Sequence, residues 1–151
     1  MCHLPIEISD TENIVRVILS PHHIKKGKLK PAIFRSQANT DEVSVIRQTH
    51  MGSDFCKEKA LILHRPPVSQ YIGFAVIKAG EIRKSGSTVE DSCDVYCGHA
   101  DIAHGVILEP HEPADSQMSR FITERCRTML ISTTYYPDPN PSESGWTGPN
   151  F

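Results

Sequence analysis

Residues 71–77 read Y-I-G-F-A-V-I, a nearly continuous apolar run of strand length, and predict a central strand of a sheet. Residues 13–19 (N-I-V-R-V-I-L) are rich in β-branched side chains and predict a second strand. Residues 43–47 predict another extended segment, and residues 32–34 a short strand. The chain therefore contains several strands that can pair in one sheet.

Helical spacing is clearest over residues 114–130. The apolar positions that make its stripe are Met118, Phe121, Ile122, Cys126, Met129 and Leu130. A second helix is expected to begin at Ser53, as N-cap, and to run to about Leu63, and residues 81–84 predict one helical turn. Helices and strands mix without regular alternation, so the sequence predicts an α+β fold: one compact domain with a mixed or antiparallel sheet packed by about two helices.

The composition excludes several classes of protein. The 151 residues are 38% hydrophobic and 23% charged, which suits a folded domain. Sixteen lysines and arginines against 18 acidic residues give a net charge of −2, which argues against generic, charge-driven nucleic-acid binding. No apolar run approaches 18 residues, and no basic start precedes an apolar stretch, so we expect no membrane span, no secretory signal and a cytoplasmic location.

The last fifteen residues differ from the rest. Residues 137–151 read P-D-P-N-P-S-E-S-G-W-T-G-P-N-F and predict an extended or disordered tail on a domain of residues 1–136. Trp146 and Phe151 are apolar anchors that would dock the tail on the body or on a protein partner. One hypothesis is therefore a non-catalytic interaction module or a subunit of a prokaryotic assembly.

The cysteines are odd in number and scattered: Cys2, Cys56, Cys93, Cys97 and Cys126. Without a secretory signal, this pattern predicts free thiols in a reducing compartment. A zinc-stabilised domain is a further hypothesis, because Cys93, Cys97, His99 and His104 are zinc-ligand types within twelve residues. Three residues separate the two cysteines where a zinc knuckle has two, so core or surface thiols and loop histidines are the simpler interpretation.

Residues 98–105 read G-H-A-D-I-A-H-G and predict a turn-rich segment. His99 and His104 could act as an acid and base pair near neutral pH, with Asp101 holding the tautomer of one ring. Ordinary turn chemistry is the alternative. These three residues are the catalytic candidates.

A basic loop and a short strand supply the candidates for substrate binding. Residues 21–30 hold two histidines and four lysines, and His23, Lys25 and Lys26 could hold a phosphate. A solvated loop is the alternative, and the charge is too small for tight non-specific binding to duplex DNA, which uses about 6–10 phosphate contacts. Ser44 and Arg47 could line a pocket for an anionic ligand. Together these residues predict a small enzyme-like protein that binds a phosphate-containing substrate, either a nucleotide or RNA.

Four segments resemble a known pattern: P-x-x-F-R at residues 31–35, S-V-x-R at 44–47, the apolar strand at 71–77, and H-A-D-I at 99–102. This order is similar to a family of small prokaryotic proteins that share an S-V-x-R element and a later H-A-[DE]-I element. The resemblance spans residues 14–105 and carries no assigned activity. It implies that Ser44, Arg47, His99 and Asp101 converge on one pocket.

Overall fold

The computed structural model describes residues 2–151, which form one α+β domain around a six-stranded antiparallel sheet of order β6-β7-β4-β1-β5-β8. A small separate hairpin pairs β2 with β3. The elements are β1 (Asn13–Ser20), β2 (Ile24–Lys25), β3 (Lys28–Leu29), the 3₁₀ helix η1 (Pro31–Phe34), β4 (Glu42–Arg47), α1 (Gln48–Met51), α2 (Ser53–Leu63), β5 (Gln70–Lys78), α3 (Ala79–Lys84), β6 (Thr88–Asp91), β7 (His99–Ala103), α4 (Gln117–Ile131) and β8 (Thr134–Pro137).

The predicted strands at 13–19, 43–47 and 71–77 are confirmed as β1, β4 and β5. β5 lies inside the sheet because it pairs with β1 on one side and β8 on the other. Both faces of β5 are buried, which explains its continuous apolar sequence.

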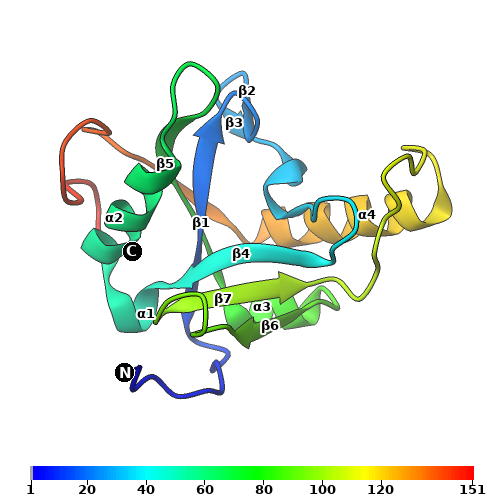
Figure 1. Cartoon of the computed structure of the whole chain (residues 1–151), viewed down its shortest axis with the longest axis horizontal. Coiled ribbons are helices and arrows are strands. Elements are labelled where there is room, and N and C mark those ends of the chain that lie inside the picture. The colour runs from blue at the N-terminus through cyan, green and yellow to red at the C-terminus, as the bar shows by residue number, and fades with distance from the viewer. Residues whose placement is uncertain (1) are drawn as a thin grey trace.

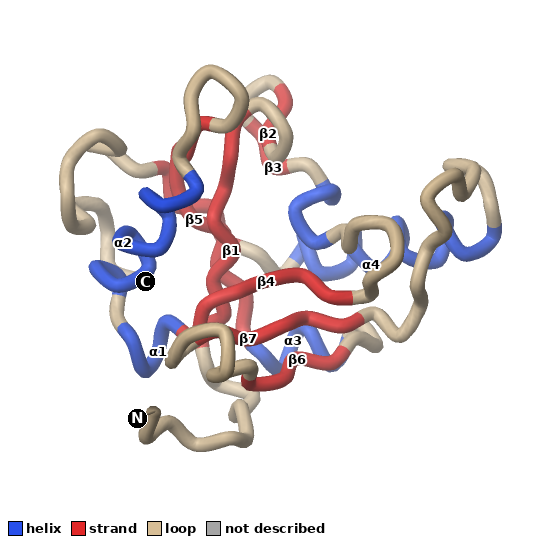
Figure 2. Tube along the Cα trace, in the orientation of Figure 1, coloured by secondary structure: helices blue, strands red, loops and turns tan. Residues whose placement is uncertain are grey.

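The two faces of the sheet are covered unequally. Figures 1 and 2 show α3 and α4 behind β4, β7 and β6, on what we call the back face. The back core joins Val45, Ile77 and Ile102 to Ile82 of α3 and Ile122 of α4. On the opposite, front face, α2 and the C-terminal segment cover the β1–β5 half. In Figure 1 no helix lies in front of β4 and β7.

β1 and β4 diverge soon after they meet. They pair only at Ile14 with Arg47 and at Val15 with Ile46, whereas β1 pairs with β5 along its whole length. In Figure 1 the two strands run at a wide angle to one another. η1 packs against the core beside this opening, with Ile33 and Phe34 fully buried.

Some local predictions were wrong. Residues 32–34 form a turn of 3₁₀ helix, not a strand, because Pro31 fixes a helical φ at its start. Residues 99–103 form β7, not a turn-rich loop: buried Ala100 and Ile102 alternate with His99 and Asp101, a period of two.

The helix ends also differ from the predictions. Gly52, at φ 86°, is the N-cap of α2, and Ser53 is already helical. α4 begins at Gln117, because the Ser116 hydroxyl accepts the backbone N–H of Ser119. Within residues 2–151 every helix is too short or too polar to cross a membrane.

Candidate functional site

The open half of the front face collects polar side chains from two paired strands. Ser44 of β4 lies opposite Asp101 of β7, and Ile46 lies opposite His99. Opposite residues of antiparallel strands share a face, so Ser44, His99 and Asp101 point to the same side. Here the structure brings together three of the residues singled out in the sequence.

His99 belongs to a short hydrogen-bond chain. The Ser92 hydroxyl donates to Asp101 Oδ2 at 2.7 Å, and Ser92 Oγ also lies 3.0 Å from His99 Nδ1. A serine has one hydroxyl proton, so when that proton serves Asp101 the hydroxyl can only accept from Nδ1–H. This arrangement fixes the neutral imidazole as the Nδ1–H tautomer, which leaves Nε2 with its lone pair.

His99 faces a cavity of about 350 Å³ on the front face, which we call the His99 groove. Its floor is β1 and β4, and α2 and the loop before β7 form its walls. The walls are mostly apolar side chains: Ile62, Leu63, Val95 and Tyr96. The Tyr96 ring meets the His99 ring edge-on at 5.0 Å, and Lys59 Nζ lies 4.3 Å from the centre of the Tyr96 ring. Within residues 2–151 no group hydrogen-bonds to His99 Nε2.

Arg16 lies where β1 and β4 separate. Its Nε donates to Ile33 O at 2.8 Å, and its Nη1 donates to Ser44 O at 3.1 Å, a carbonyl that has lost its strand partner. In the chain from residue 2 onward no carboxylate pairs with this guanidinium. Burial without a counter-ion lowers the pKa of Arg16 to about 10.

A second cavity, of about 310 Å³, adjoins the His99 groove at Arg16 and Ser44, which line both. We call it the polar cavity. It also receives Arg35, Glu42 and Asp101. The chain Asp101–Ser92–His99 therefore joins the two cavities.

His104 does not join His99. Its Nε2–H donates to Phe34 O at 2.6 Å, and Ser87 Oγ lies 2.7 Å from its Nδ1 and donates to it. His104 is buried, and burial lowers its pKa. Both ring nitrogens are occupied, so the pair of histidines proposed from the sequence is not formed.

Arg47 is also held elsewhere. It alternates to the face opposite Ser44 and is completely buried. Its guanidinium donates to both oxygens of Glu12 at 3.0 Å and to Asp91 at 2.7 Å. Burial would lower the pKa of Arg47, but the hydrogen bonds to Glu12 and Asp91 outweigh it and raise that pKa. Arg47 is therefore a paired structural charge. Of the other three residues named by the family resemblance, Ser44 lines both cavities, whereas His99 lines only the His99 groove and Asp101 only the polar cavity.

The phosphate candidates of the basic loop are apart from His99. Lys25 and Lys26 are exposed on the β2–β3 hairpin, which Figure 1 shows at the far end of β1. His23 is buried, and its Nδ1 accepts the backbone N–H of Leu19. Its role in the structure is to close the turn after β1.

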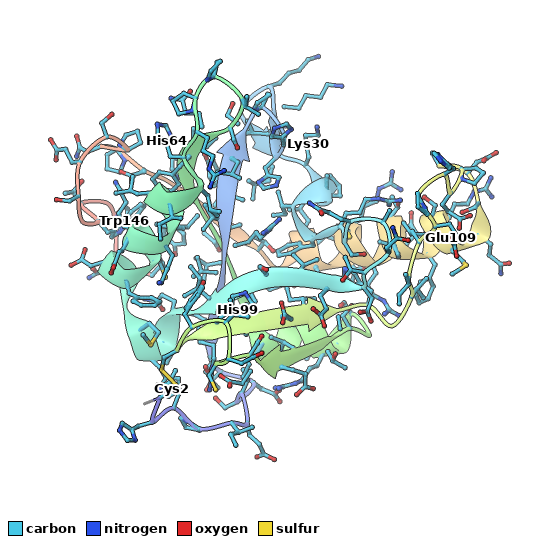
Figure 3. The ribbon with its side chains drawn as sticks, in the orientation of Figure 1. Cys2, Lys30, His64, His99, Glu109 and Trp146 are labelled. Carbon is cyan, nitrogen blue, oxygen red and sulfur yellow. A yellow bond between two sulfur atoms is a disulfide. The ribbon has the colours of Figure 1, made fainter. Side chains whose placement is uncertain are left out.

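The expectation that all cysteines are free is wrong, because Cys2 and Cys97 form a disulfide. The two are 95 residues apart in sequence, so only the fold brings them together; Figure 3 shows Cys2 beside α1. Within residues 2–151 no three His, Cys, Asp or Glu side chains gather as a metal site, and Cys93 and His104 lie outside any such set. Cys93 is exposed with a free thiol, and Cys56 and Cys126 are free and buried.

The C-terminal segment is extended and lies on the body. Trp146 and Phe151 pack against Phe74 of β5 with tilted rings, whose centres lie 5.3 and 5.5 Å away, and Figure 3 shows Trp146 beside α2. These aromatic side chains complete the front core.

Sequence reasoning missed Arg16 and Ser92. The sequence predicts Arg16 only as part of a strand, although a single charged residue between β-branched residues could have marked it as a candidate site residue. Ser92 had no signal, because its role depends on the turn that brings it back to β7. A comparison with known protein families, curated proteins and solved structures found no match to this chain.

Proposed function

We propose that the His99 groove binds a nucleotide or a nucleotide unit of RNA and that His99 acts on it as a general base. The observation that carries this proposal is the free Nε2 of an imidazole whose tautomer is set by Ser92 and Asp101. A base placed in this way can take a proton from a substrate hydroxyl and return it later, which contributes about 10²–10⁴-fold in rate.

The cavity supports a ligand of this class. A volume of about 350 Å³ lies within the usual range for small-molecule sites, roughly 300–1,000 Å³. Ile62, Leu63 and Val95 offer an apolar wall to a nucleobase. Arg16 at the floor lacks a carboxylate partner in residues 2–151, and buried charges are normally paired, so an anionic group of the ligand supplies the missing charge.

The test measures binding and turnover separately. Isothermal titration calorimetry with ribonucleoside 5′-monophosphates should show saturable binding, and the matched nucleosides should bind at least tenfold more weakly. Incubation with ribodinucleotides, followed by mass spectrometry, should show a product whose rate falls about 100-fold in His99→Gln. The control is His111→Gln, because His111 is an exposed histidine outside the groove.

Absence of binding by any of the four monophosphates at low salt would refute the nucleotide assignment. Binding without turnover, unchanged in His99→Gln, would leave a nucleotide-binding protein and remove the catalytic role of His99.

A further inference from the structure

Positive charge is concentrated in one stretch of the chain. Residues 13–40 contain six of the 16 lysines and arginines and none of the 18 acidic residues. The six are Arg16, Lys25, Lys26, Lys28, Lys30 and Arg35. Within residues 2–151 none of them forms an ion pair with a carboxylate. A protein with a net charge of −2 thus carries one strongly basic segment, which contains no acidic residue and whose six cations form no ion pair among the described residues.

The hairpin at the tip of this segment displays three of the charges. Lys26 and Gly27 form its turn with φ values of 52° and 75°, which matches the two positive values of a tight hairpin turn. Lys25, Lys26 and Lys28 are exposed there. Glycine or asparagine is favoured at the first turn position, so a lysine there costs backbone energy.

A third cavity continues the basic surface from the hairpin toward the sheet. It lies between η1 and α4, measures about 280 Å³, and receives Lys30, Arg35 and Arg127. Arg127 pairs with Glu124 at 2.7 Å, so within residues 2–151 the unpaired charges of this cavity are Lys30 and Arg35. Hydroxyl groups of Thr123 and Ser119 accept from Arg35 at 2.9 and 2.8 Å, which orients the guanidinium without neutralising it.

Arg35 links this cavity to the substrate site. It lines both the third cavity and the polar cavity, and the polar cavity meets the His99 groove at Arg16. In Figure 3 Lys30 lies near the hairpin end of the molecule and His99 in front of the sheet. We call the surface from Lys25 through Lys30 and Arg35 to Arg16 the basic path.

We propose that the basic path binds the sugar–phosphate backbone of a single-stranded polynucleotide, one nucleotide of which occupies the His99 groove. This inference rests on the proposed function and extends it from a nucleotide to a polymer. Lysines and arginines that follow a groove are the usual means of holding a strand independently of its sequence. The strand is single because a base that enters a groove of about 350 Å³ beneath α2 has left its pairing partner.

Two carboxylates lie beside the basic path, and their negative charge should weaken the binding of a polyanion. Asp101 and Glu42 line the polar cavity, but Asp101 accepts from Ser92, whereas Glu42 is exposed. Removal of the Glu42 charge should therefore strengthen binding of a polyanion.

The experiment is fluorescence anisotropy with labelled oligouridine and oligoadenine strands of increasing length, beside calorimetry with UMP and AMP. Affinity should rise with length beyond a mononucleotide. The triple variant Lys25→Gln/Lys26→Gln/Lys28→Gln should bind the long strands at least tenfold more weakly, and its salt slope should fall by about 2, near 0.7 per lost contact. Its affinity for UMP and AMP should not change, and Glu42→Gln should bind the strands more tightly.

The matched control is Lys78→Gln/Lys84→Gln/Arg120→Gln, which removes the same charge from exposed sites outside residues 13–40. An equal loss in both triple variants, or affinity independent of length while UMP still binds, would overturn the basic path and leave the nucleotide site standing. Equal binding of duplexes would overturn the single-strand assignment. Lysine-dependent binding to vesicles of anionic lipid, with none to the strands, would assign the surface to membranes instead. Failure of UMP and AMP to bind at all would refute the proposed function.

Discussion

Lys57 Nζ lies 2.5 Å from Asp138 Oδ2, and both side chains are fully buried. The Tyr71 hydroxyl donates to the same oxygen at 2.6 Å, and Lys57 also donates to Asn140 O at 3.0 Å. Burial would raise the pKa of Asp138, but the hydrogen bonds from Lys57 and Tyr71 outweigh it and lower that pKa below 3.8. This charged pair fastens the C-terminal segment to α2 and β5.

Loss of both partners should cost less than the sum of the two single losses. Lys57→Met leaves the Asp138 carboxylate buried and unpaired, so we expect it to lower the free energy of unfolding by about 3–5 kcal/mol. Lys57→Met/Asp138→Asn should lose less than the sum of the single variants. Urea unfolding measures both, with exposed Glu58→Gln on the same helix as the control. A loss below about 1 kcal/mol in Lys57→Met would contradict a buried pair.

Stability should fall in mild acid because of His23. Burial first, and then the charges of Arg16, His22 and Lys30, lower the pKa of His23 to about 4, from 6.5 in the unfolded chain. Between these values the unfolded state binds more protons, so stability is lost as the pH falls from 6.5 to 4, by about 3 kcal/mol in all. Buried His104 acts in the same direction.

The measurement is urea unfolding at a series of pH values. His23→Asn keeps a side-chain acceptor for the Leu19 N–H and should flatten the dependence over this range. His111→Asn, at an exposed site, should leave the curve unchanged. An unaltered curve in His23→Asn would show that His23 is not the group responsible.

The tautomer of His99 can be observed directly. Two-bond ¹H–¹⁵N correlation spectra of the neutral ring should show Nδ1 protonated, because Ser92 accepts from it. Ser92→Ala removes that acceptor and should shift the ring toward the Nε2–H form. An Nε2–H tautomer in the unmodified protein would rule out the base role assigned to this atom.

The disulfide should stabilise the fold strongly. It joins residues 95 positions apart, and loop-closure entropy for such a loop amounts to about 4.7 kcal/mol. Cys2→Ser should therefore lower the free energy of unfolding by roughly this amount. Cys93→Ser, at the exposed thiol, should have little effect. Equal stability of Cys2→Ser and its parent without reductant would show that the bond does not form.

The fold was predictable where local pattern and packing agree. β5 is apolar because both its faces are buried, and α4 places Ile122, Cys126 and Met129 on the back core, as its spacing predicts. β7 was missed because its polar positions, His99 and Asp101, resemble turn chemistry when read alone. The alternation with buried Ala100 and Ile102 was the better guide.

The types of residue in the site could be predicted from the sequence, but the contacts between them could not. Ser44, His99 and Asp101 meet because β4 and β7 pair, although the two strands are more than fifty residues apart. Arg47 and His104 are equally plausible candidates by residue type. Arg47, however, donates to Glu12 and Asp91, and His104 donates to Phe34 O. Only three-dimensional contacts distinguish a satisfied charge from an available one.

Arg16 has a consequence for the kinetics of binding. Its guanidinium donates to a carbonyl on β4 and to another on η1, and so fixes the spacing of β1 and β4 where the two strands diverge. A site that is already open loses little conformational entropy when a ligand enters. Association should then be a single diffusional step without gating, and the observed rate constant should increase linearly with ligand concentration rather than reach a plateau.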